Sequence, residues 1–386
     1  MRIAIYHNLP DGGAIRALHE LVKHSYREVE YDLYQLAPVD TKSRYDFSPF
    51  VKRHHAYDYI YAPTKKDFAF EIATQFGALR KLQKRIASEI DSRHYDAVFV
   101  HHCAISQTPF LLEYLQTKSL YFIQEPRRLS YEADFYRESL ALIPRWMQPF
   151  WVRRQKILTH LDAQNARRAT SALCNSQYMK DAIQQAYGIS ATICYLGIDD
   201  KTFNYVSTTT KKRQLLVVGT LHPAKAQQLA IEAVALLESS QRPRLVLVYE
   251  NFDGRYRNTL RQLAQQKAVD LVLKRGVSDA ELVTLYRQSQ ATLCMAEREP
   301  FGFTPIESAA CGTPVIAIAE GGFLETVKSS NGLLVKRDAE LVADAIMQVM
   351  KKSWDSQAMS QTTRKQWNWH ASAKTYLAAL RELIHG

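Results

Sequence analysis

The sequence predicts an α/β protein built from two Rossmann-like domains with parallel sheets. Short apolar runs alternate with longer helical patterns, which is typical of parallel strands covered by helices on both faces. The same alternation starts again after a polar linker, Ser207–Arg213. A chain of 386 residues is also longer than most single domains, which have one hydrophobic core. We therefore expect a first domain over residues 1–206 and a second over residues 207–367.

The first domain begins with a strand at Arg2–Tyr6, a loop ending in Gly12-Gly13 and a helix from Ala14. Further strands are predicted at Tyr57–Tyr61, Asp96–Val100, Ser119–Ile123, Ser171–Cys174 and Thr192–Tyr195. Long helical patterns separate several of them, at Lys66–Asp91 and Ser176–Tyr187. This order favours a parallel sheet, because parallel strands need crossover connections.

The second domain repeats the pattern, with a helix at Ala226–Leu237 after its first strand. Strands are predicted at Gln214–Gly219, Arg244–Tyr249, Asp270–Lys274, Ala291–Cys294 and Pro314–Ala319. In folds of this kind a ligand usually binds at the carboxyl ends of the strands.

Several classes of protein are disfavoured by what the sequence lacks. It contains no Gly-x-Gly-x-x-Gly and no Gly-x-x-x-x-Gly-Lys-Ser/Thr, which weakens a dehydrogenase or a P-loop enzyme. It also contains no Asp-x-Asp pair to clamp a metal-bound diphosphate. The 5 cysteines form no Cys-x-x-Cys pair, and neither a signal peptide nor a membrane span is visible. We expect a cytoplasmic protein with reduced thiols, no metal and no cofactor.

The net charge of +11 points to an acidic partner without identifying it. No nucleic-acid-binding signature is present, so anionic lipid and phosphorylated small molecules remain open. Residues Arg145–Arg154 (RWMQPFWVRR) mix large aromatic side chains with arginines, which suits an anionic membrane surface. Pro144 and Pro149 predict a short, broken element there. In the alternative interpretation Trp146 and Trp151 pack inward.

The segment Glu297–Glu325 (EREPFGFTPIESAACGTPVIAIAEGGFLE) is the richest in the chain. Thr304-Pro305-Ile306-Glu307 has the pattern of a capping box with proline at the first helical position. The backbone before that helix can approach a ligand closely at Gly302, as in metal-free phosphate sites. Glu299 and Glu307 could reach ligand hydroxyls from the loop and the first turn. Alternatively, Glu307 only completes its cap and Glu299 is a solvated acid.

This segment resembles the Glu-x7-Glu signature of retaining GT-B glycosyltransferases of family GT4. Gly312, Pro314, Val315, Gly321-Gly322 and Glu325 continue the match. Resemblances in the same order along the chain are Gly12-Gly13, Asn175-Ser176, Tyr195–Asp199 and Gly276–Leu282. Trp369 begins a last helix similar to the one that in this family crosses back, so residues 368–386 are expected on the first domain. The resemblance implies the GT-B fold, with two parallel sheets facing each other across a cleft.

The resemblance also implies roles for particular residues. Glu307 would bind the nucleotide ribose and Glu299 the donor sugar, while Lys225 would stabilise the leaving diphosphate. Backbone amides of Phe301, Gly302, Phe303 and Thr304 would hold the sugar or diphosphate, and Gly13 would lie in the N-terminal donor loop. The implied reaction moves a sugar from a nucleotide-sugar donor to a glycan or lipid-linked acceptor, with retention and without metal.

Some positions depart from the family pattern. Thr220, a candidate donor-binding residue, stands where an arginine often partners the lysine, and Arg275 or another cation would have to compensate. Gln124 occupies the place of a functional histidine in the family, so His102, with its neighbour His101, is a candidate for that role. These departures keep a non-catalytic subunit, which binds nucleotide-sugar or a partner transferase, as an alternative. An epimerase or phosphorylase of the same fold matches the motifs less well.

Overall fold

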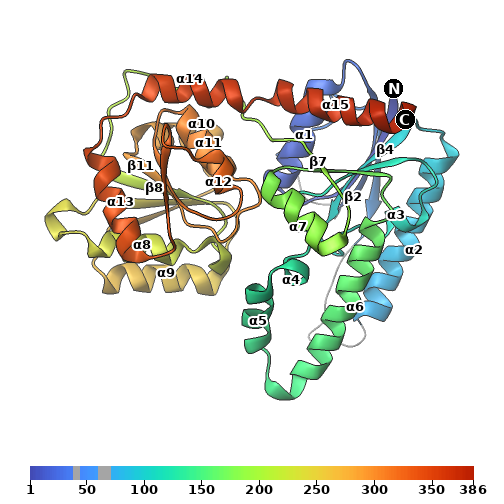
Figure 1. Ribbon diagram of the computed structural model, residues 1–386, viewed down its shortest axis with the longest axis horizontal. Helices are drawn as coiled ribbons and strands as arrows, with labels where there is room; N and C mark the ends of the chain where they lie inside the picture. The colour runs from blue at the N-terminus through green and yellow to red at the C-terminus, as the bar shows by residue number, and fades with distance from the viewer. Residues whose placement is uncertain (38–43, 60–70) are drawn as a thin grey trace. The chain divides into compact units, whose positions relative to one another are not determined.

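The computed structural model describes residues 1–37, 44–59 and 71–386, with the side chains of residues 71–75 left out (Figure 1). It divides into two compact units, one of residues 1–195 with 369–386 and one of residues 196–368. Residues 196–206, assigned to the first domain on sequence, therefore group with the second unit. The reason is local packing, because Phe203 contacts the Tyr286 ring and the Asn204 carbonyl accepts a hydrogen bond from Arg287.

The first unit contains a seven-stranded sheet, and the strand pairs in it are parallel. Its strands are β1 (Arg2–Asn8), β2 (Glu30–Ala37), β3 (Arg53–Asp58), β4 (Ala97–Cys103), β5 (Ser119–Phe122), β6 (Ser171–Cys174) and β7 (Thr192–Ile193). Its helices are α1 (Gly13–Ser25), α2 (Glu71–Ser92), α3 (Leu111–Tyr114), α4 (Arg128–Tyr131), α5 (Ala133–Ala141), η1 (Arg145–Met147), α6 (Gln148–Ala166), α7 (Gln177–Tyr187) and α15 (Trp369–His385). The strand order is β3-β2-β1-β4-β5-β6-β7.

The second unit contains a six-stranded parallel sheet of order β10-β9-β8-β11-β12-β13. Its strands are β8 (Gln214–Val218), β9 (Arg244–Tyr249), β10 (Leu271–Arg275), β11 (Ala291–Cys294), β12 (Val315–Ile318) and β13 (Gly332–Val335). Its helices are η2 (Pro223–Lys225), α8 (Gln227–Leu236), η3 (Ser239–Gln241), α9 (Gly254–Gln266), α10 (Asp279–Gln288), α11 (Phe303–Ala310), α12 (Phe323–Thr326), α13 (Ala339–Lys351) and α14 (Ser356–Gln366). Helices cover both faces of this sheet (Figure 1).

The prediction of two α/β sheets with parallel strands is confirmed. Apolar runs such as Ala291–Cys294 and Val315–Ile318 are buried along their whole length, as expected for strands covered on both faces. Two strands were not predicted. In β2, Asp32 interrupts the apolar pattern, although it is buried and accepts a hydrogen bond from Tyr95 at 2.7 Å. The other, β13, is only four residues long.

Two predictions in the first half reach outside the described residues. The strand expected at Tyr57–Tyr61 overlaps the end of β3, and its residues 60 and 61 are not described. The helix expected at Lys66–Asp91 corresponds to α2, and residues 66–70 are not described. The helix expected at Ser176–Tyr187 is confirmed as α7, whose first turn is capped by the Ser176 hydroxyl.

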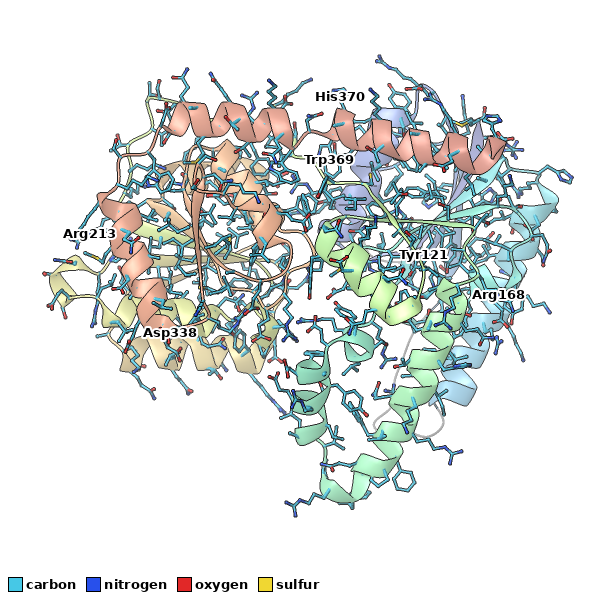
Figure 2. The ribbon with its side chains drawn as sticks, viewed as in Figure 1. Tyr121, Arg168, Arg213, Asp338, Trp369 and His370 are labelled. Atoms are coloured by element: carbon cyan, nitrogen blue, oxygen red, sulfur yellow. The ribbon has the colours of Figure 1, made fainter. Side chains whose placement is uncertain are left out.

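Helix α15 packs against the first unit, to which the chain returns at Trp369. The Tyr31 hydroxyl donates a hydrogen bond to the Tyr376 hydroxyl at 3.2 Å, and both rings are fully buried. Nearby, the His370 ring meets the His24 ring of α1 edge-on, with 4.9 Å between centroids (Figure 2 labels His370 beside Trp369). These contacts anchor the C-terminal helix to α1 and β2.

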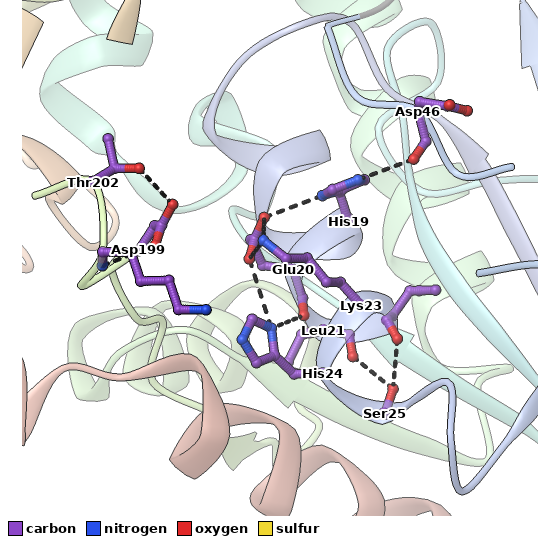
Figure 3. Close-up of polar contacts among 11 residues, drawn as sticks. His19, Glu20, Leu21, Lys23, His24, Ser25, Asp46, Asp199 and Thr202 are labelled. Carbon is purple, nitrogen blue, oxygen red and sulfur yellow. Dashed lines mark hydrogen bonds and ion pairs between the residues drawn. The ribbon is translucent and has the colours of Figure 1, made fainter. Parts of the chain in front are cut away.

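Helix α1 follows β1 and carries a polar cluster around Glu20 (Figure 3). The Glu20 carboxylate lies 3.0 Å from the Lys23 ammonium and 3.2 Å from the His19 ring nitrogen. Burial acts to raise the pKa of Glu20, but the hydrogen bonds from His19 and Lys23 outweigh it and hold the pKa below its ordinary value. Thus Glu20 stays charged although it is almost fully buried.

Across the described part of the chain, no helix combines the length and the apolarity that crossing a bilayer requires.

Candidate active site

The second sheet changes winding direction between β8 and β11, which are neighbours in the sheet but not in sequence. At such a point the connections leave the two strands in opposite directions, and ligands bind beyond their carboxyl ends. Lys225 lies in the connection after β8, and Glu299 lies in the connection after β11. The topology therefore brings two candidate residues, 74 positions apart, to one place.

Lys225 and Glu299 form an ion pair, with 2.5 Å between the ammonium nitrogen and the Oε2 atom. Their side chains are 36% and 23% exposed, so solvent and a ligand can reach both. The backbone joins the same two loops, because the Glu297 amide donates to the Ala224 carbonyl at 2.9 Å. The two loops are thus joined at this point, and the donor-site roles of Lys225 and Glu299 stay predictions.

The two loops carry backbone strain beside these charged residues. Ala226 has φ of 48° and Arg298 has φ of 47°, so both non-glycine residues adopt the left-handed conformation. That conformation costs roughly 1–2 kcal/mol for an L-residue with a Cβ atom. Such strain is often found at functional sites. Here it fixes the backbone directly after Lys225 and directly before Glu299.

Helix α11 begins at Phe303, two residues earlier than the predicted capping box requires. Its N-cap is Gly302, with φ of 99°, and no side chain caps the helix. The capping-box prediction is therefore wrong, because Thr304 is already helical and Glu307 turns inward. Gly302 has no side chain with which to cap α11, and the helix dipole places partial positive charge at this end. Phe303 and Thr304 are half-buried at this end.

The ring of Phe301 is part of the packing beneath the loop that follows Glu299. The ring is buried and packs against the Trp367 ring at 5.5 Å and the Phe303 ring at 5.6 Å. Behind the same loop, the Gly322 amide donates to the Glu299 carbonyl at 2.7 Å. A Cβ atom on Gly322 would lie 2.5 Å from the Phe301 carbonyl oxygen, so only glycine fits there. The Gly-Gly loop thus supports the backbone that carries Glu299.

Glu307 is only 4% exposed, and its Oε2 atom accepts a hydrogen bond from the Tyr286 hydroxyl at 2.9 Å. Tyr286 lies on α10 and is fully buried, so it fixes the direction of the carboxylate. Burial and the nearby Glu299 and Glu307 carboxylates raise the pKa of the Cys294 thiol at the end of β11. Both glutamates therefore lie near Cys294, at the carboxyl end of the same strand.

Arg337 is a residue that the sequence analysis missed. Its guanidinium donates to the carbonyls of Met295 and Ala296 at 3.0 and 3.2 Å and pairs with Glu320 at 2.8 Å. It thereby braces the chain that leads from β11 towards Glu299. The only available sequence signal was a cation directly after a short strand, β13, which was itself not predicted.

Thr220 and Arg275 lie at the same edge of the sheet, but the contacts described for them are with residues other than Lys225 and Glu299. The Thr220 carbonyl accepts a hydrogen bond from the Gln227 side chain at 2.8 Å, and its own side chain is exposed. Arg275 ends β10, which is separated from β8 by β9. Its guanidinium lies over the Phe252 ring, 4.9 Å from the centroid, and donates to the Glu250 carbonyl. The compensation expected of Arg275 remains a prediction.

In the first unit, the equivalent change of direction lies between β1 and β4. Gly13 begins α1 directly after β1, and the Gln124 side-chain amide donates to the Ala14 carbonyl at 2.9 Å. The Gln124 carbonyl in turn accepts from the Asn175 side chain at 3.1 Å. Gln124 is almost fully buried. Its two hydrogen bonds connect the start of α1 to the ends of β5 and β6.

Three histidines gather at the ends of β1 and β4. Burial lowers the pKa of His102 to about 4, and burial with the neighbouring His54 and His102 lowers that of His7 to about 3. Burial also places the pKa of His101 well below its ordinary value. At neutral pH these rings are uncharged, and His102 is a weak base. Among the described residues, His7 Nε2, His101 Nε2 and His102 Nδ1 have no hydrogen-bond partner.

Within the described ranges, no three His, Cys, Asp or Glu side chains are placed to hold a metal ion.

Residues 199–366 match the model of the family described as glycosyl transferases group 1. This range is nearly the whole of the second unit. The chain has the GT-B fold, and most of its second unit is similar to the glycosyl transferases group 1 family. A curated relative, the D-inositol 3-phosphate glycosyltransferase of Acidothermus cellulolyticus, is 31% identical over 174 residues. That match covers 37% of this chain and 38% of the relative, so it spans well under half of either protein.

Solved GT-B structures match over almost the entire chain. The sucrose-phosphate synthase of Thermosynechococcus elongatus has a TM-score of 0.78 at 18% identity, covering 100% of this chain and 99% of that one. HepE of Anabaena, in complex with UDP-glucose, has a TM-score of 0.74 at 16% identity, covering 99% and 100%. At these identities the likeness establishes the GT-B fold, and the group 1 match lies on the unit that carries Lys225, Glu299 and Glu307.

Proposed function

We propose that the protein is a retaining hexosyltransferase that moves a sugar from a nucleotide-diphosphate sugar to a glycan or lipid-linked acceptor, without a metal. The observation that carries this proposal is the pairing of Lys225 with Glu299 at 2.5 Å, beside the uncapped start of α11. A cation, a helix N-terminus and a hydroxyl-binding carboxylate together suit a sugar attached to a diphosphate. HepE, of the same fold, has been solved with UDP-glucose.

In this proposal the second unit binds the donor. The diphosphate lies against the α11 amides of Phe303 and Thr304 and beside the Lys225 ammonium. Glu299 exchanges part of its ion pair for hydroxyls of the donor sugar, and Glu307, oriented by Tyr286, accepts from the ribose hydroxyls.

The reaction breaks the bond between the sugar anomeric carbon and the diphosphate oxygen and forms one to the acceptor oxygen. Negative charge grows on the leaving diphosphate, and Lys225 stabilises it more in the transition state than in the bound donor. The proton of the acceptor hydroxyl passes to the leaving phosphate on the same face. This front-face path retains the anomeric configuration and needs no protein nucleophile.

Metal independence and a cytoplasmic location belong to the same proposal. One lysine and a helix N-terminus supply the positive charge that a divalent ion supplies in other transferases. All 5 cysteines are buried and free, which is compatible with a reducing compartment. The first unit would take the acceptor at the ends of β4 and β5, where His102 and Gln124 lie.

The test is donor turnover by the purified protein with UDP-, GDP- and ADP-sugars, with and without EDTA. We expect hydrolysis or transfer of one donor in EDTA, with an unchanged anomeric configuration by NMR. Lys225→Ala should lower this rate, whereas the matched variant Lys267→Ala, at an exposed lysine of the same unit, should not. Donor binding without any turnover would instead support the non-catalytic subunit. Activity lost in EDTA and restored by Mg²⁺ would show that a metal is required.

A further inference from the structure

Helices α5 and α6 form a hairpin that projects from the first unit, with residues 142–147 at its tip (Figure 1). The sequence analysis expected a short, broken element here, and that expectation is wrong. Helix α6 runs for 19 residues, because Pro149 lies in its first turn, where a missing amide proton costs no hydrogen bond. Hydrogen bonds close the turn, including one from the Gln148 side chain to the Ile143 carbonyl at 3.1 Å.

Three large apolar side chains point outward at this tip. Leu142 is 85% exposed, Trp146 75% and Phe150 65%, and they are the most exposed large apolar residues in the described chain. By contrast, Trp151 is 6% exposed and packs against the Tyr136 ring with 5.1 Å between centroids. The alternative interpretation, in which both tryptophans pack inward, therefore holds for Trp151 and fails for Trp146.

The exposed charges at the tip and along the first half of α6 are positive, whereas the exposed acid Glu138 lies on α5 one turn before Leu142. Arg145, Arg153 and Lys156 are exposed beside the apolar side chains. Between Glu138 and Asp162 the sequence has no acidic residue, and Asp162 is buried, where it accepts a hydrogen bond from Tyr187. A projecting apolar tip with exposed cations on its α6 side matches the depth profile of an anionic bilayer surface, which is apolar inside and negative at the headgroups.

We propose that the tip of the α5–α6 hairpin docks the protein on an anionic lipid surface. Leu142, Trp146 and Phe150 enter the boundary between headgroups and acyl chains, while Arg145, Arg153 and Lys156 pair with lipid phosphates. The inference concerns the first unit alone and does not depend on the proposed transferase activity. Three apolar side chains together with three cations combine buried apolar area with attraction to anionic lipid, the two terms with which interfacial binding scales.

The test is cosedimentation of the full chain, without donor, with vesicles of phosphatidylcholine alone or with 30 mol% phosphatidylglycerol. We expect binding to the anionic vesicles at low salt and its loss as salt rises. Leu142→Ser/Trp146→Ser/Phe150→Ser and, separately, Arg145→Gln/Arg153→Gln/Lys156→Gln should each lower the affinity roughly tenfold to a hundredfold.

Two control variants match these changes on exposed residues of the second unit. Leu236→Ser/Leu334→Ser/Leu341→Ser removes three exposed leucines, and Lys267→Gln/Lys336→Gln/Lys351→Gln removes three exposed lysines. Both controls should bind vesicles like the wild type. If either control loses as much affinity as its hairpin counterpart, the binding is nonspecific electrostatic or hydrophobic adsorption and the proposal fails.

Insertion has an optical signature as well. Of the 5 tryptophans, Trp146 is the only one among the exposed large apolar residues, so brominated lipids should quench mainly its fluorescence. Trp146→Phe should remove that quenching and leave cosedimentation largely intact. Absence of wild-type binding to anionic vesicles, or unchanged binding by both hairpin variants, overturns the proposal. So does a hairpin-dependent dimer that forms in place of vesicle binding.

Discussion

The Lys225 ammonium and the Glu299 carboxylate are 2.5 Å apart, although one follows β8 and the other follows β11. Each residue therefore holds the other in place until a donor arrives. The pair is partly exposed, and pairs of this kind contribute only about 0–1 kcal/mol to folding. In the proposed reaction the pair pre-positions a cation for the leaving diphosphate and a carboxylate for the sugar.

Lys225→Ala should lower turnover by roughly 10²-fold or more, because the lost charge acts mainly in the transition state. The free energy of unfolding should change by less than about 1 kcal/mol. Measuring kcat, KM and urea unfolding on the same preparation separates the two effects. A variant that unfolds earlier yet turns over normally would show that Lys225 is only structural.

Tyr286→Phe should raise KM for the donor while leaving kcat nearly unchanged, because the hydroxyl acts through Glu307 and not on the reacting atoms. Loss of this buried hydrogen bond should also cost about 1–3 kcal/mol of stability. Tyr376→Phe is the matched control, since it removes a buried hydroxyl bonded to Tyr31 in the first unit. If both variants shift KM equally, the effect on Tyr286 is global rather than local.

Gly322→Ala should slow turnover by displacing the loop that carries Glu299. Its Cβ would meet the Phe301 and Pro300 carbonyl oxygens at 2.5 and 2.7 Å, so that backbone must move. We expect a loss of about 1–3 kcal/mol in stability, as for other overpacked sites. Gly254→Ala, at the start of α9 with no atom within 4 Å of the added Cβ, should be harmless in both assays.

Acid should destabilise the first unit through its buried histidines. The pKa of His102 lies at about 4 and that of His7 at about 3 in the folded protein, below the ordinary value of 6.5. Between pH 6.5 and 4 the unfolded chain thus binds more protons than the folded one, and stability falls as pH falls. Each ring contributes up to about 1.4 kcal/mol per pH unit. Stability should therefore be fully retained above pH 6.5.

Urea unfolding between pH 4 and 7.5 measures this slope. His102→Gln should flatten it, whereas His160→Gln, at an exposed histidine on α6, should leave it as in the wild type. An equal slope in wild type and His102→Gln would contradict the assignment to His102.

The sequence predicted those parts of the fold that depend on local patterns. Strands such as Arg244–Tyr249 and Ser171–Cys174 were located to the residue, because they are uninterrupted apolar runs. Strand β2 was missed because Asp32 breaks the run, and only the Tyr95 hydroxyl and the Arg2 guanidinium, far away in sequence, make that carboxylate tolerable.

The candidate site was predicted from motif resemblance rather than from local physics. Spacing named Glu299 and Glu307, but it suggested a capping box in which Glu307 faces its own helix start. Tertiary structure overrides that pattern, since Tyr286 draws the carboxylate inward and Gly302 starts the helix earlier. The support from Arg337 depends on contacts across the fold and leaves no local pattern in the sequence. Gly322 was named by the motif, but its close approach to the Phe301 backbone was not predictable from it.

The left-handed backbone at Ala226 and Arg298 lowers the stability of the folded protein, and we expect the same conformation to favour turnover. Glycine at both positions would relieve the strain and should raise the melting temperature. The two loops would then sample more conformations. Lys225 and Glu299 would spend less time in their paired arrangement, and turnover should drop. Selection of variants for a higher melting temperature alone would therefore favour substitutions that lower turnover.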